Sequence, residues 1–459
     1  MPVSAIDSFL FKNLFGTKEI RAIFDDAKYI DYCVQVEAAL ARAQASCGVI
    51  PQNAADTISE VASRVSLDHD KLEEETEIVG YPILPLVRQL SAACGEDAGR
   101  YLHWGATTQD IQDTAAVSQM KHGLEVVETK LKAVCKTLSS LALKYKDTPM
   151  AGRTHLQHAL PVTFGYKCAV YLSSFQRHLE RLEQLRPRCL LVQFGGAAGT
   201  LASLGSDAEK SLQVRRFLAQ KLALHDPSIT WHTARDGIAE IINFLALTGG
   251  SLGKLAKDFI IMSSNEFSEV SEPFVPHRGA SSTMPQKRNP ISSEVILAAS
   301  KILRSNASLC LDAVITDFER ASGPWHLEWA AVPESFVIAV GALSQAEFAL
   351  SGLVVNTERM SRNLNSTRGL IVAEAVMMEL AKSIGRQRAH DVVYEACGET
   401  IKSGDEKRTL FETLAEREEV VGVIAWARLE ELCKPQNYLG AATRMVEDVL
   451  AVSWKMGVE

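Results

Sequence analysis

The sequence has few of the features that mark disulfide-bonded or zinc-binding proteins. Its nine cysteines are scattered along 459 residues, and no two of them form a C-x-x-C pair. Such spacing argues against a structural zinc site and against a disulfide framework. We therefore expect reduced thiols that pack in the core of a cytosolic protein.

Long apolar runs and an excess of positive charge are also missing. No apolar run reaches the roughly 18 to 20 residues that cross a bilayer, and the stretch MPVSAIDSFLFKNLFG lacks the charged start and apolar core of a signal peptide. The 48 Lys and Arg residues against 56 Asp and Glu residues give a net charge of -8. Nucleic-acid binding requires a basic face. We therefore expect a cytoplasmic protein with neither a membrane nor a nucleic acid as partner.

Helical periodicity is the dominant pattern that is present. A heptad stripe runs for more than thirty residues and predicts one helix over 114–146. That helix would be about 50 Å long at 1.5 Å per residue, so it must pack in a large bundle or against other subunits. The stripe consists of Met120, Leu124, Val127, Leu131, Val134, Leu138 and Leu141.

Similar patterns predict helices over 163–185, 234–267, 291–316 and 333–353. Alternation typical of strands is limited to short ambiguous pieces such as CLLVQF. The fold class is therefore all-α with a long central helical bundle. The breaks in the pattern place three domains at 1–105, 106–353 and 354–459, with no low-complexity linker between them.

One short polar segment, ASSTMPQKRNP at 280–290, stands out against this background. Gly279 and Pro290 bracket it, which predicts a loop, and helical periodicity resumes with Pro290 near the first turn. Backbone N–H groups at that helix start favour an anion, and Lys287 and Asn289 add hydrogen-bond donors. On composition alone, a solvated polar loop is an equally good interpretation.

Two other polar segments precede long helices. HWGATTQDIQDT carries Thr107 and Thr108 before the heptad helix, and GRTHLQHALPVTFG carries His155 and Gln157 before the next one. Glu294 follows Asn289 by five residues. A single histidine is more often structural than catalytic, but three polar segments at comparable helix starts favour a shared chemical site.

These three segments resemble the signature blocks of the fumarase/aspartase superfamily, and SSTMPQKRNP resembles its most characteristic one. The blocks occur in the family's order and cover nearly the whole chain. The resemblance implies an all-helical subunit of three domains. It also implies a homotetramer around a central helical bundle, with each active site drawing blocks from three subunits.

Within that superfamily, several stretches are most similar to the 3-carboxy-cis,cis-muconate cycloisomerases of aromatic catabolism, among them QFGGAAGTLASLG and GLIVAEAVMMELAKSIGRQRAHDVVYEA. The adenylosuccinate lyases are less similar. Their N-terminal Arg-Tyr pair is replaced here by FGTKEIRAIF, and VGYPILPL lacks their histidine. His155, however, departs from the cycloisomerase pattern and keeps open a C–N or C–O lyase acting on a substituted succinate.

The resemblance also implies the chemistry. The superfamily adds or removes a proton on the carbon next to a carboxylate, through an aci-carboxylate intermediate that preorganised donors stabilise. It implies a small di- or tricarboxylate substrate and no metal or organic cofactor. The implied catalytic residues are Ser281, His155 and Glu294. The implied substrate-binding residues are Thr107, Thr108, Gln157, Ser282, Met284, Lys287 and Asn289.

Other polar motifs are interpreted as structural. FGGAAGTLASLG lacks the strand–turn–helix context of a dinucleotide-binding loop, so we expect a tight turn. His232 is expected to cap or pack more often than to touch substrate, and Trp325, His326 and Glu328 to line or support the pocket. A retired enzyme kept as a structural or binding protein remains a third class, against which the intact Ser281, Lys287 and Asn289 argue.

Overall fold

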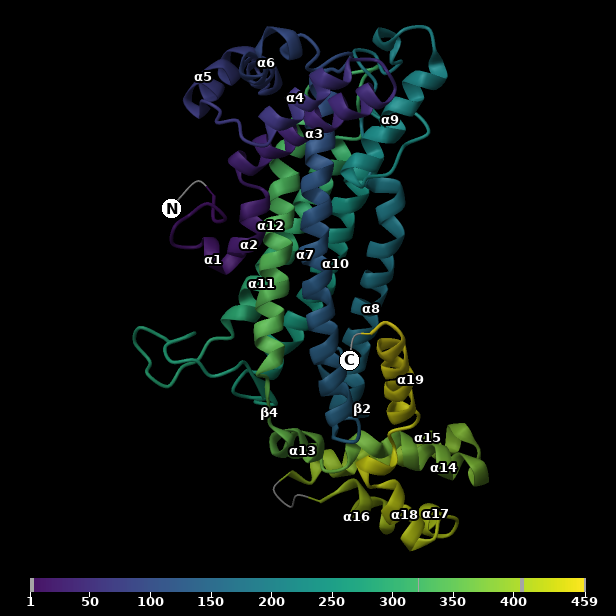
Figure 1. Cartoon of the computed structure of the whole chain (residues 1–459). Coiled ribbons are helices and arrows are strands. Elements are labelled where there is room, and N and C mark those ends of the chain that lie inside the picture. The colour runs from purple at the N-terminus through teal and green to yellow at the C-terminus, as the bar shows by residue number, and fades with distance from the viewer. Residues whose placement is uncertain (1–3, 321, 405–407, 458–459) are drawn as a thin grey trace. The chain divides into compact units, whose positions relative to one another are not determined.

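A computed structural model describes residues 4–320, 322–404 and 408–457 of the chain, and most of them are helical (Figure 1). Six shorter helices come first and five long helices dominate the middle of the chain. The first six are α1 (Lys12–Phe15), α2 (Lys18–Ile23), α3 (Asp26–Ser46), α4 (Gln52–Ala62), α5 (His69–Val79) and α6 (Ile83–Gly99). The five long ones are α7 (Thr108–Lys144), α8 (Phe164–Cys189), α10 (Asp236–Met262), α11 (Ile291–Asp312) and α12 (Pro324–Ser351).

The remaining elements are short. Between α8 and α10 lie a 3-10 turn, η1 (Ala202–Leu204), and α9 (Ala208–Leu222). After α12 the elements are α13 (Thr357–Asn365), η2 (Leu370–Val372), α14 (Ala373–Ile384), α15 (Arg386–Lys402), α16 (Leu410–Ala415), α17 (Glu418–Val421), α18 (Trp426–Leu432), η4 (Pro435–Asn437) and α19 (Ala442–Lys455). Two small antiparallel sheets pair β1 (Pro149–Thr154) with β2 (Gln157–Thr163), and β3 (Val270–Ser271) with β4 (Val354–Val355).

By its contacts the chain separates into two compact units. Unit 1 is Met1–Lys130, His178–Gly253 and Val295–Ser344, and unit 2 is Leu131–Arg177, Lys254–Glu294 and Gln345–Glu459. The divisions fall inside the five long helices, each of which contributes residues to both units. They do not test the predicted boundaries at 105 and 353, so the three-domain division stays a prediction.

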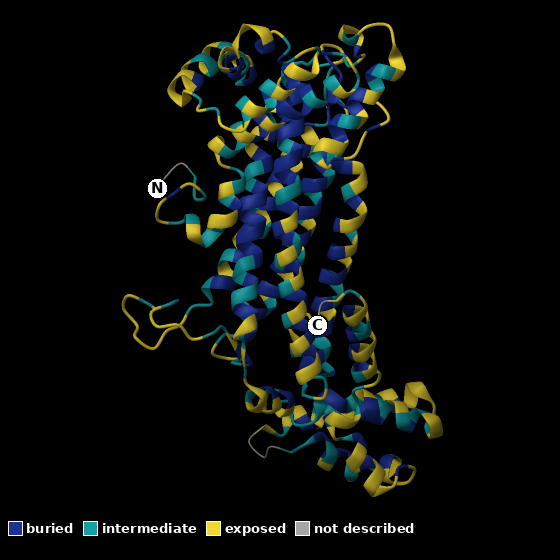
Figure 2. Cartoon of the chain, in the orientation of Figure 1, coloured by how far each residue is buried: buried dark blue, intermediate teal, exposed yellow. Residues whose placement is uncertain are grey.

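The heptad stripe is confirmed as the buried face of α7. Six of its seven residues, from Met120 to Leu138, have no exposed surface, and Figure 2 shows the buried residues along the long helices. The seventh, Leu141, is half-buried, and Ala142 is fully buried beside it. A straight helix has 3.6 residues per turn, so the inward face drifts from a strict 3.5-residue stripe.

The predicted start of the helix at 333 is wrong. α12 begins nine residues earlier, at Pro324, and runs through Pro333. A proline suits the first turn of a helix because its missing N–H is not needed there. Pro333 lies inside the helix and removes one hydrogen bond, a loss that the surrounding packing tolerates.

An 18-residue window of α12 is long and apolar enough to cross a membrane, which qualifies the expectation from the sequence. However, 67% of that window is buried, as in a core helix.

The C-terminal part of unit 2 has a core of its own. α14 to α18 lie together at the yellow-green end of the chain in Figure 1. Their inward residues are fully buried, among them Val376, Leu380, Val392, Leu410 and Leu414. This helical cluster lies within the predicted domain 354–459.

Candidate active site

The segment that carries Thr107 and Thr108 is held by a buried carboxylate in unit 1. Asp110, in the first turn of α7, accepts a hydrogen bond from the backbone N–H of Thr107 at 3.0 Å. It also accepts from the N–H groups of Gly195 and Gly196 at 3.0 and 2.9 Å, and lies 2.7 Å from Nε2 of His232. Asp110 is only 1% exposed. It therefore ties the start of α7 to a glycine-rich loop and is not free for substrate.

Gln109 has a similar structural role. Its amide nitrogen donates to Asp113 and to the carbonyl of His232, and its oxygen accepts from Arg320 at 2.8 Å. Arg320 also donates to the carbonyl of Ala197 at 2.5 Å. In the described structure, the half-buried hydroxyls of Thr107 and Thr108 have no hydrogen-bond partner. Within the TTQD block, these two hydroxyls are left without an internal partner, and their role in binding substrate stays a prediction.

The glycine-rich loop is a tight turn that packs against this block, as expected from its sequence. A side chain at Gly195 would meet Thr230 at 2.5 Å, and Gly199 has a φ of +86°. Gly195 and Gly196 direct their N–H groups to Asp110. The loop thus serves the local fold around Thr107, and no strand–turn–helix unit for a dinucleotide surrounds it.

His232, Glu328 and Trp325 all support this region from buried positions. Arg235, 1% exposed, lies between Asp113 and Glu328, with hydrogen bonds of 2.5 to 2.9 Å. Trp325 donates its indole N–H to Asp113 at 3.1 Å. Burial raises the pKa of Glu328, although Arg235 opposes that shift. His326 is exposed, but its Nδ1 lies 3.2 Å from the Gly323 carbonyl and its ring packs against Trp329, so whether it lines a pocket stays a prediction.

The segment with His155 and Gln157 is a β-hairpin and not a helix start, which corrects the sequence interpretation. Thr154 pairs with Gln157, so His155 and Leu156 form a two-residue turn. Both have positive φ, 51° and 62°, as a type I′ turn requires. Such angles are uncommon for residues other than glycine and recur at functional sites. The turn presents His155, Leu156 and Gln157 to solvent.

A buried ion pair anchors this hairpin within unit 2. Arg153 donates two hydrogen bonds to Glu269, at 2.7 and 3.0 Å, and Glu269 has no exposed surface. Asn363 donates to the same carboxylate at 2.9 Å. His158 lies beside this pair, and its pKa is lowered by burial and by Arg153, with Glu269 opposing. The neutral His158 therefore faces the anchor, while His155 is displayed at the tip.

The segment 280–290 forms a closed, exposed loop. Ala280 and Arg288 form a bridge, and the Asn289 N–H donates to the Gly279 carbonyl at 2.9 Å. The Ser281 hydroxyl accepts from the N–H groups of Thr283 and Met284 at 3.3 and 3.1 Å. Ser281 and Asn289 are half-buried, whereas Ser282, Met284 and Lys287 are exposed. The loop thus displays most of the predicted catalytic and binding groups.

The predicted anion site at the start of α11 is already occupied by a side chain of the same chain. Glu272 accepts from the N–H groups of Ser292 and Ser293, at 3.1 and 2.8 Å, and from the Ser293 hydroxyl at 2.8 Å. Its negative charge suits the helix N-terminus. This expectation of a substrate anion there is therefore wrong, because Glu272 satisfies those donors.

His155 and Glu294 do not meet within one chain. Both side chains are exposed and both belong to unit 2, but in its described residues no hydrogen bond or ion pair joins them. Their pairing stays a prediction, which an assembly of several copies would have to supply. Thr107 and Thr108 belong to unit 1, and His155, Gln157, Ser281, Ser282, Met284, Lys287 and Asn289 to unit 2.

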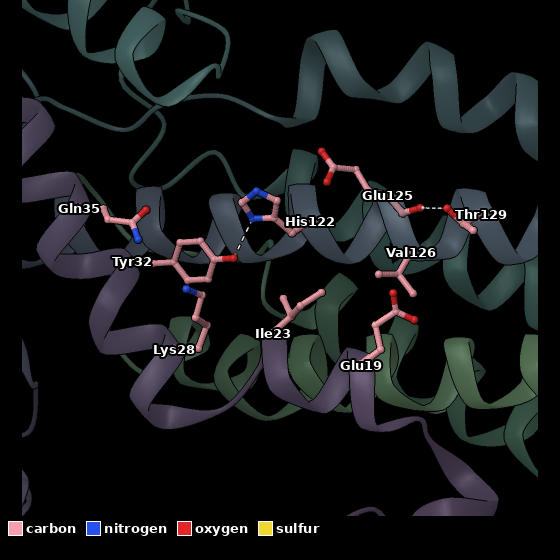
Figure 3. Close-up of a pocket in the computed structure, with 9 residues that line it drawn as sticks. All are labelled: Glu19, Ile23, Lys28, Tyr32, Gln35, His122, Glu125, Val126 and Thr129. Carbon is pink, nitrogen blue, oxygen red and sulfur yellow. Dashed lines mark hydrogen bonds between the residues drawn. The ribbon is translucent and has the colours of Figure 1, made fainter. Parts of the chain in front are cut away.

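One open cavity is lined by other residues. It has a volume of about 500 Å³ and lies in unit 1 between α2, α3 and the middle of α7. Figure 3 shows its lining, in which the Tyr32 hydroxyl lies 2.7 Å from Nδ1 of His122. Its lining mixes Lys28 with Glu19 and Glu125 and contains none of the predicted site residues. We place the candidate site on the polar segments, because they carry the residues that the superfamily resemblance implies and this cavity does not.

A mainly helical chain with five long helices, a Ser-Lys-Asn loop and a histidine hairpin fits the architecture of a carboxylate lyase. Comparison with known proteins agrees: the chain belongs to the Lyase family, whose model matches residues 15–303, and a second model, the adenylosuccinate lyase C-terminus, matches 369–449. The protein is an enzyme of the fumarase/aspartase superfamily, with the all-α fold predicted from its sequence.

Its relatives perform different reactions. It is 43% identical to trans-aconitate decarboxylase 1 of Mycosarcoma maydis, over 96% of this chain and 88% of the relative. It is 40% identical to the 3-carboxy-cis,cis-muconate cycloisomerase of Acinetobacter baylyi, over 96% and 98% of the two chains. The crystal structure of a fumarate lyase from Mesorhizobium sp. BNC1 matches with a TM-score of 0.89 and 53% identity, over 95% and 98%.

Proposed function

We propose that this enzyme lactonizes 3-carboxy-cis,cis-muconate or a closely related unsaturated tricarboxylate in the cytoplasm. The observation that carries the proposal is the exposed loop 280–290, which carries Ser281 and Lys287. The Ala280–Arg288 bridge joins the two ends of this loop and so closes its base. The similarity to cycloisomerases over nearly the whole chain supports this choice among the family's reactions.

The reaction requires one ring closure and one proton transfer. A carboxylate oxygen of the substrate attacks a carbon of the double bond and forms the C–O bond of the lactone. The π electrons move to the neighbouring carbon and spread into its carboxylate as an aci-carboxylate. An enzyme group then delivers a proton to that carbon, so atoms and charge balance. The protein must bind the carboxylates, stabilise the added charge and hold that proton.

The displayed side chains suit these tasks. Lys287, exposed on the loop, supplies a positive charge for the aci-carboxylate. Thr107, Thr108 and Gln157 offer donors for the remaining carboxylates. The Ser281 hydroxyl accepts two backbone N–H bonds, which stabilise the alkoxide left behind after the neutral hydroxyl delivers its proton. Ser281 is therefore the group we assign to proton transfer.

A lyase that eliminates a group from a substituted succinate is the second candidate. It is favoured by His155, because the hairpin tip displays an imidazole without a partner in the described chain. In that reaction Ser281 removes the proton next to the carboxylate, and His155, oriented by Glu294, protonates the leaving nitrogen or oxygen. The similarity to a fumarate lyase structure supports this candidate.

An assembly of several copies, which we propose to be a homotetramer, fits the surface of the long helices. Large apolar side chains stay uncovered on them, including Leu143, Val170, Leu247, Leu309 and Leu311, each 38 to 54% exposed. Exposed apolar side chains on otherwise buried helices are typical of subunit interfaces. Such contacts would let blocks of different copies complete one site.

A substrate panel followed by ultraviolet absorbance tests the proposal. The panel contains 3-carboxymuconate, trans-aconitate, fumarate with ammonia, adenylosuccinate and argininosuccinate. We expect loss of the conjugated-diene absorbance with 3-carboxymuconate and no release of carbon dioxide. Turnover of a succinate derivative alone would support the second candidate. Inactivity on all five, in a folded and tetrameric preparation, would favour a retired enzyme and overturn the proposal.

A further inference from the structure

The segment that leads into α7 has an unusual backbone. Between α6 and α7 the chain makes a series of turns over 101–105. His103 and Gly105 both have positive φ, 57° and 71°. A histidine in this conformation costs free energy and persists only where other contacts fix it. Thr107 and Thr108 follow directly, so this turn decides where their hydroxyls point.

Two polar side chains of α3 form hydrogen bonds with this turn. Glu37, 1% exposed, lies 2.6 Å from Nδ1 of His103. Gln44, with no exposed surface, donates to the Trp104 carbonyl at 2.6 Å. They are seven residues apart, which places them on the same face of the helix, two turns from each other. The interior of unit 1 therefore holds both the His103 side chain and the next backbone group.

The charge of Glu37 makes the His103 contact hard to replace. Its second oxygen, Oε2, is buried and has no hydrogen-bond partner. In the described part of the chain, His103 is the basic side chain within ion-pair distance of Glu37, and it is a cation when protonated. A buried carboxylate that loses its partner is strongly destabilising. Cys33, four residues before Glu37 on the same helix, stays neutral because burial and Glu37 raise the pKa of its thiol.

The contacts continue from the turn to the threonines. The Gly105 carbonyl accepts from the Ser203 hydroxyl at 3.2 Å, and the Thr107 N–H donates to Asp110. A side chain at Gly105 would come within 2.9 Å of Ser203 and Leu204. A change in the backbone position of His103 would therefore also displace the three residues that follow it, up to Thr107, because their backbone is tightly packed.

We propose that the Glu37–His103 ion pair is a positioning device that fixes the turn presenting Thr107 and Thr108 to the substrate carboxylate. This inference rests on the proposed function, since it assigns the threonines to substrate binding. His103 faces inward to Glu37, so it acts through the backbone and is a positioning residue, not a catalytic one.

The test compares Glu37→Gln, His103→Gln and the double variant, each as the assembled enzyme. Misplacement by about 1 Å can cost up to about 100-fold in rate. We expect kcat/KM to fall about tenfold or more in each single variant, mainly through a higher KM. Both substitutions remove the same Glu37–His103 interaction. The kcat/KM of the double variant should therefore be no lower than that of the less active single variant. If the loss of kcat/KM in the double variant equals the product of the two single losses, the two residues act independently and the proposal is overturned.

A matched control and a second measurement separate this proposal from the proposed function. His122→Gln removes another half-buried histidine of unit 1, paired with Tyr32 in the cavity of Figure 3, and should leave kcat/KM unchanged. Hydrogen exchange of the amides at 102–110 should quicken in the Glu37 and His103 variants but not in the control. Unchanged exchange refutes the positioning role, whereas an inactive parent enzyme with quickened exchange refutes only the proposed reaction.

Discussion

At the scale of single residues, the structure separates side chains that hold the protein together from those available for chemistry. Asp110, His232 and Glu272 are polar side chains that internal contacts bury or occupy. Ser281, His155 and Lys287 lie on displayed turns. The first three predictions concern single residues.

Ser281→Ala should lower kcat by orders of magnitude while the thermal midpoint changes little. The hydroxyl accepts two hydrogen bonds inside an exposed loop, each of which contributes only about 1 kcal/mol. Steady-state kinetics and thermal unfolding check both parts. Ser282→Ala is the comparison, since Ser282 is exposed next to it and is assigned to substrate binding and not to proton transfer. If Ser282→Ala loses activity while Ser281→Ala keeps it, the assignment of the two serines is reversed.

His155→Gln should distinguish the two candidate reactions. It should leave lactonization mostly intact, because ring closure has no leaving group to protonate. It should cripple elimination from a succinate, where the imidazole serves the leaving atom. Glutamine at the exposed turn removes no side-chain hydrogen bond or ion pair of the described residues. A severe loss of lactonization would show that the histidine serves that reaction as well.

The stability supplied by His103 should depend on pH. Burial disfavours the imidazolium, but the charge of Glu37 and its hydrogen bond outweigh burial, so the pKa of His103 is raised above the usual value of about 6.5. The contribution is complete below the unfolded pKa and is lost as the pH rises through the folded one. The gap in thermal midpoint between the parent and His103→Gln should narrow with rising pH. The ion pair would be contradicted if this difference in thermal midpoint did not change with pH. It would also be contradicted if His122→Gln differed from the parent by the same amount at each pH.

At the scale of elements, periodicity predicted helices well and turns poorly. α7 was expected because its apolar spacing repeats over many turns. The β1–β2 hairpin was missed because His155 and Leu156 occupy a turn that usually contains glycine or asparagine. The start of α12 was misplaced because Pro333 looks like a helix start, while packing carries the helix through it.

Gly279→Ala tests whether the closed base of the loop 280–290 matters for activity. An added methyl group would lie 2.3 Å from the Asn289 carbonyl oxygen, and the φ of Gly279 is +69°. The base should open and misplace Ser281, with a loss of at least about tenfold in kcat/KM. Gly250→Ala is a suitable control, since nothing lies within 4 Å of a side chain there. Full activity of Gly279→Ala would mean that loop closure is dispensable.

At the scale of the whole molecule, the prediction is that active sites are shared between copies. α7 is a single helix of 37 residues, about 55 Å long at 1.5 Å per residue. Thr107 precedes its first turn, and His155 follows its last residue by eleven positions. Antiparallel packing of several copies brings opposite helix ends together, which one copy of this helix cannot do alone.

Complementation checks the shared site. In an elimination assay, where both residues are required, His155→Ala and Ser281→Ala should each be inactive and should regain part of their activity when unfolded and refolded together, because some mixed sites carry neither change. Each variant refolded alone at the same total concentration is the control. Sedimentation should show a tetramer and no active monomer. An inactive mixture whose mixed oligomers are visible by mass spectrometry would rule out sharing.

The sequence by itself determined the helical class, the positions of the long helices apart from the start of α12, and the family, because helical periodicity and the loop motif are local features of the chain. Only the tertiary structure decided which polar side chains are engaged in internal hydrogen bonds and ion pairs. Asp110 meets His232 across 122 positions, and Arg153 meets Glu269 across 116. Such pairings depend on how distant segments pack, and no local pattern encodes them. The same packing turned His155 into a displayed residue and made His103, which the sequence did not single out, the residue that faces Glu37.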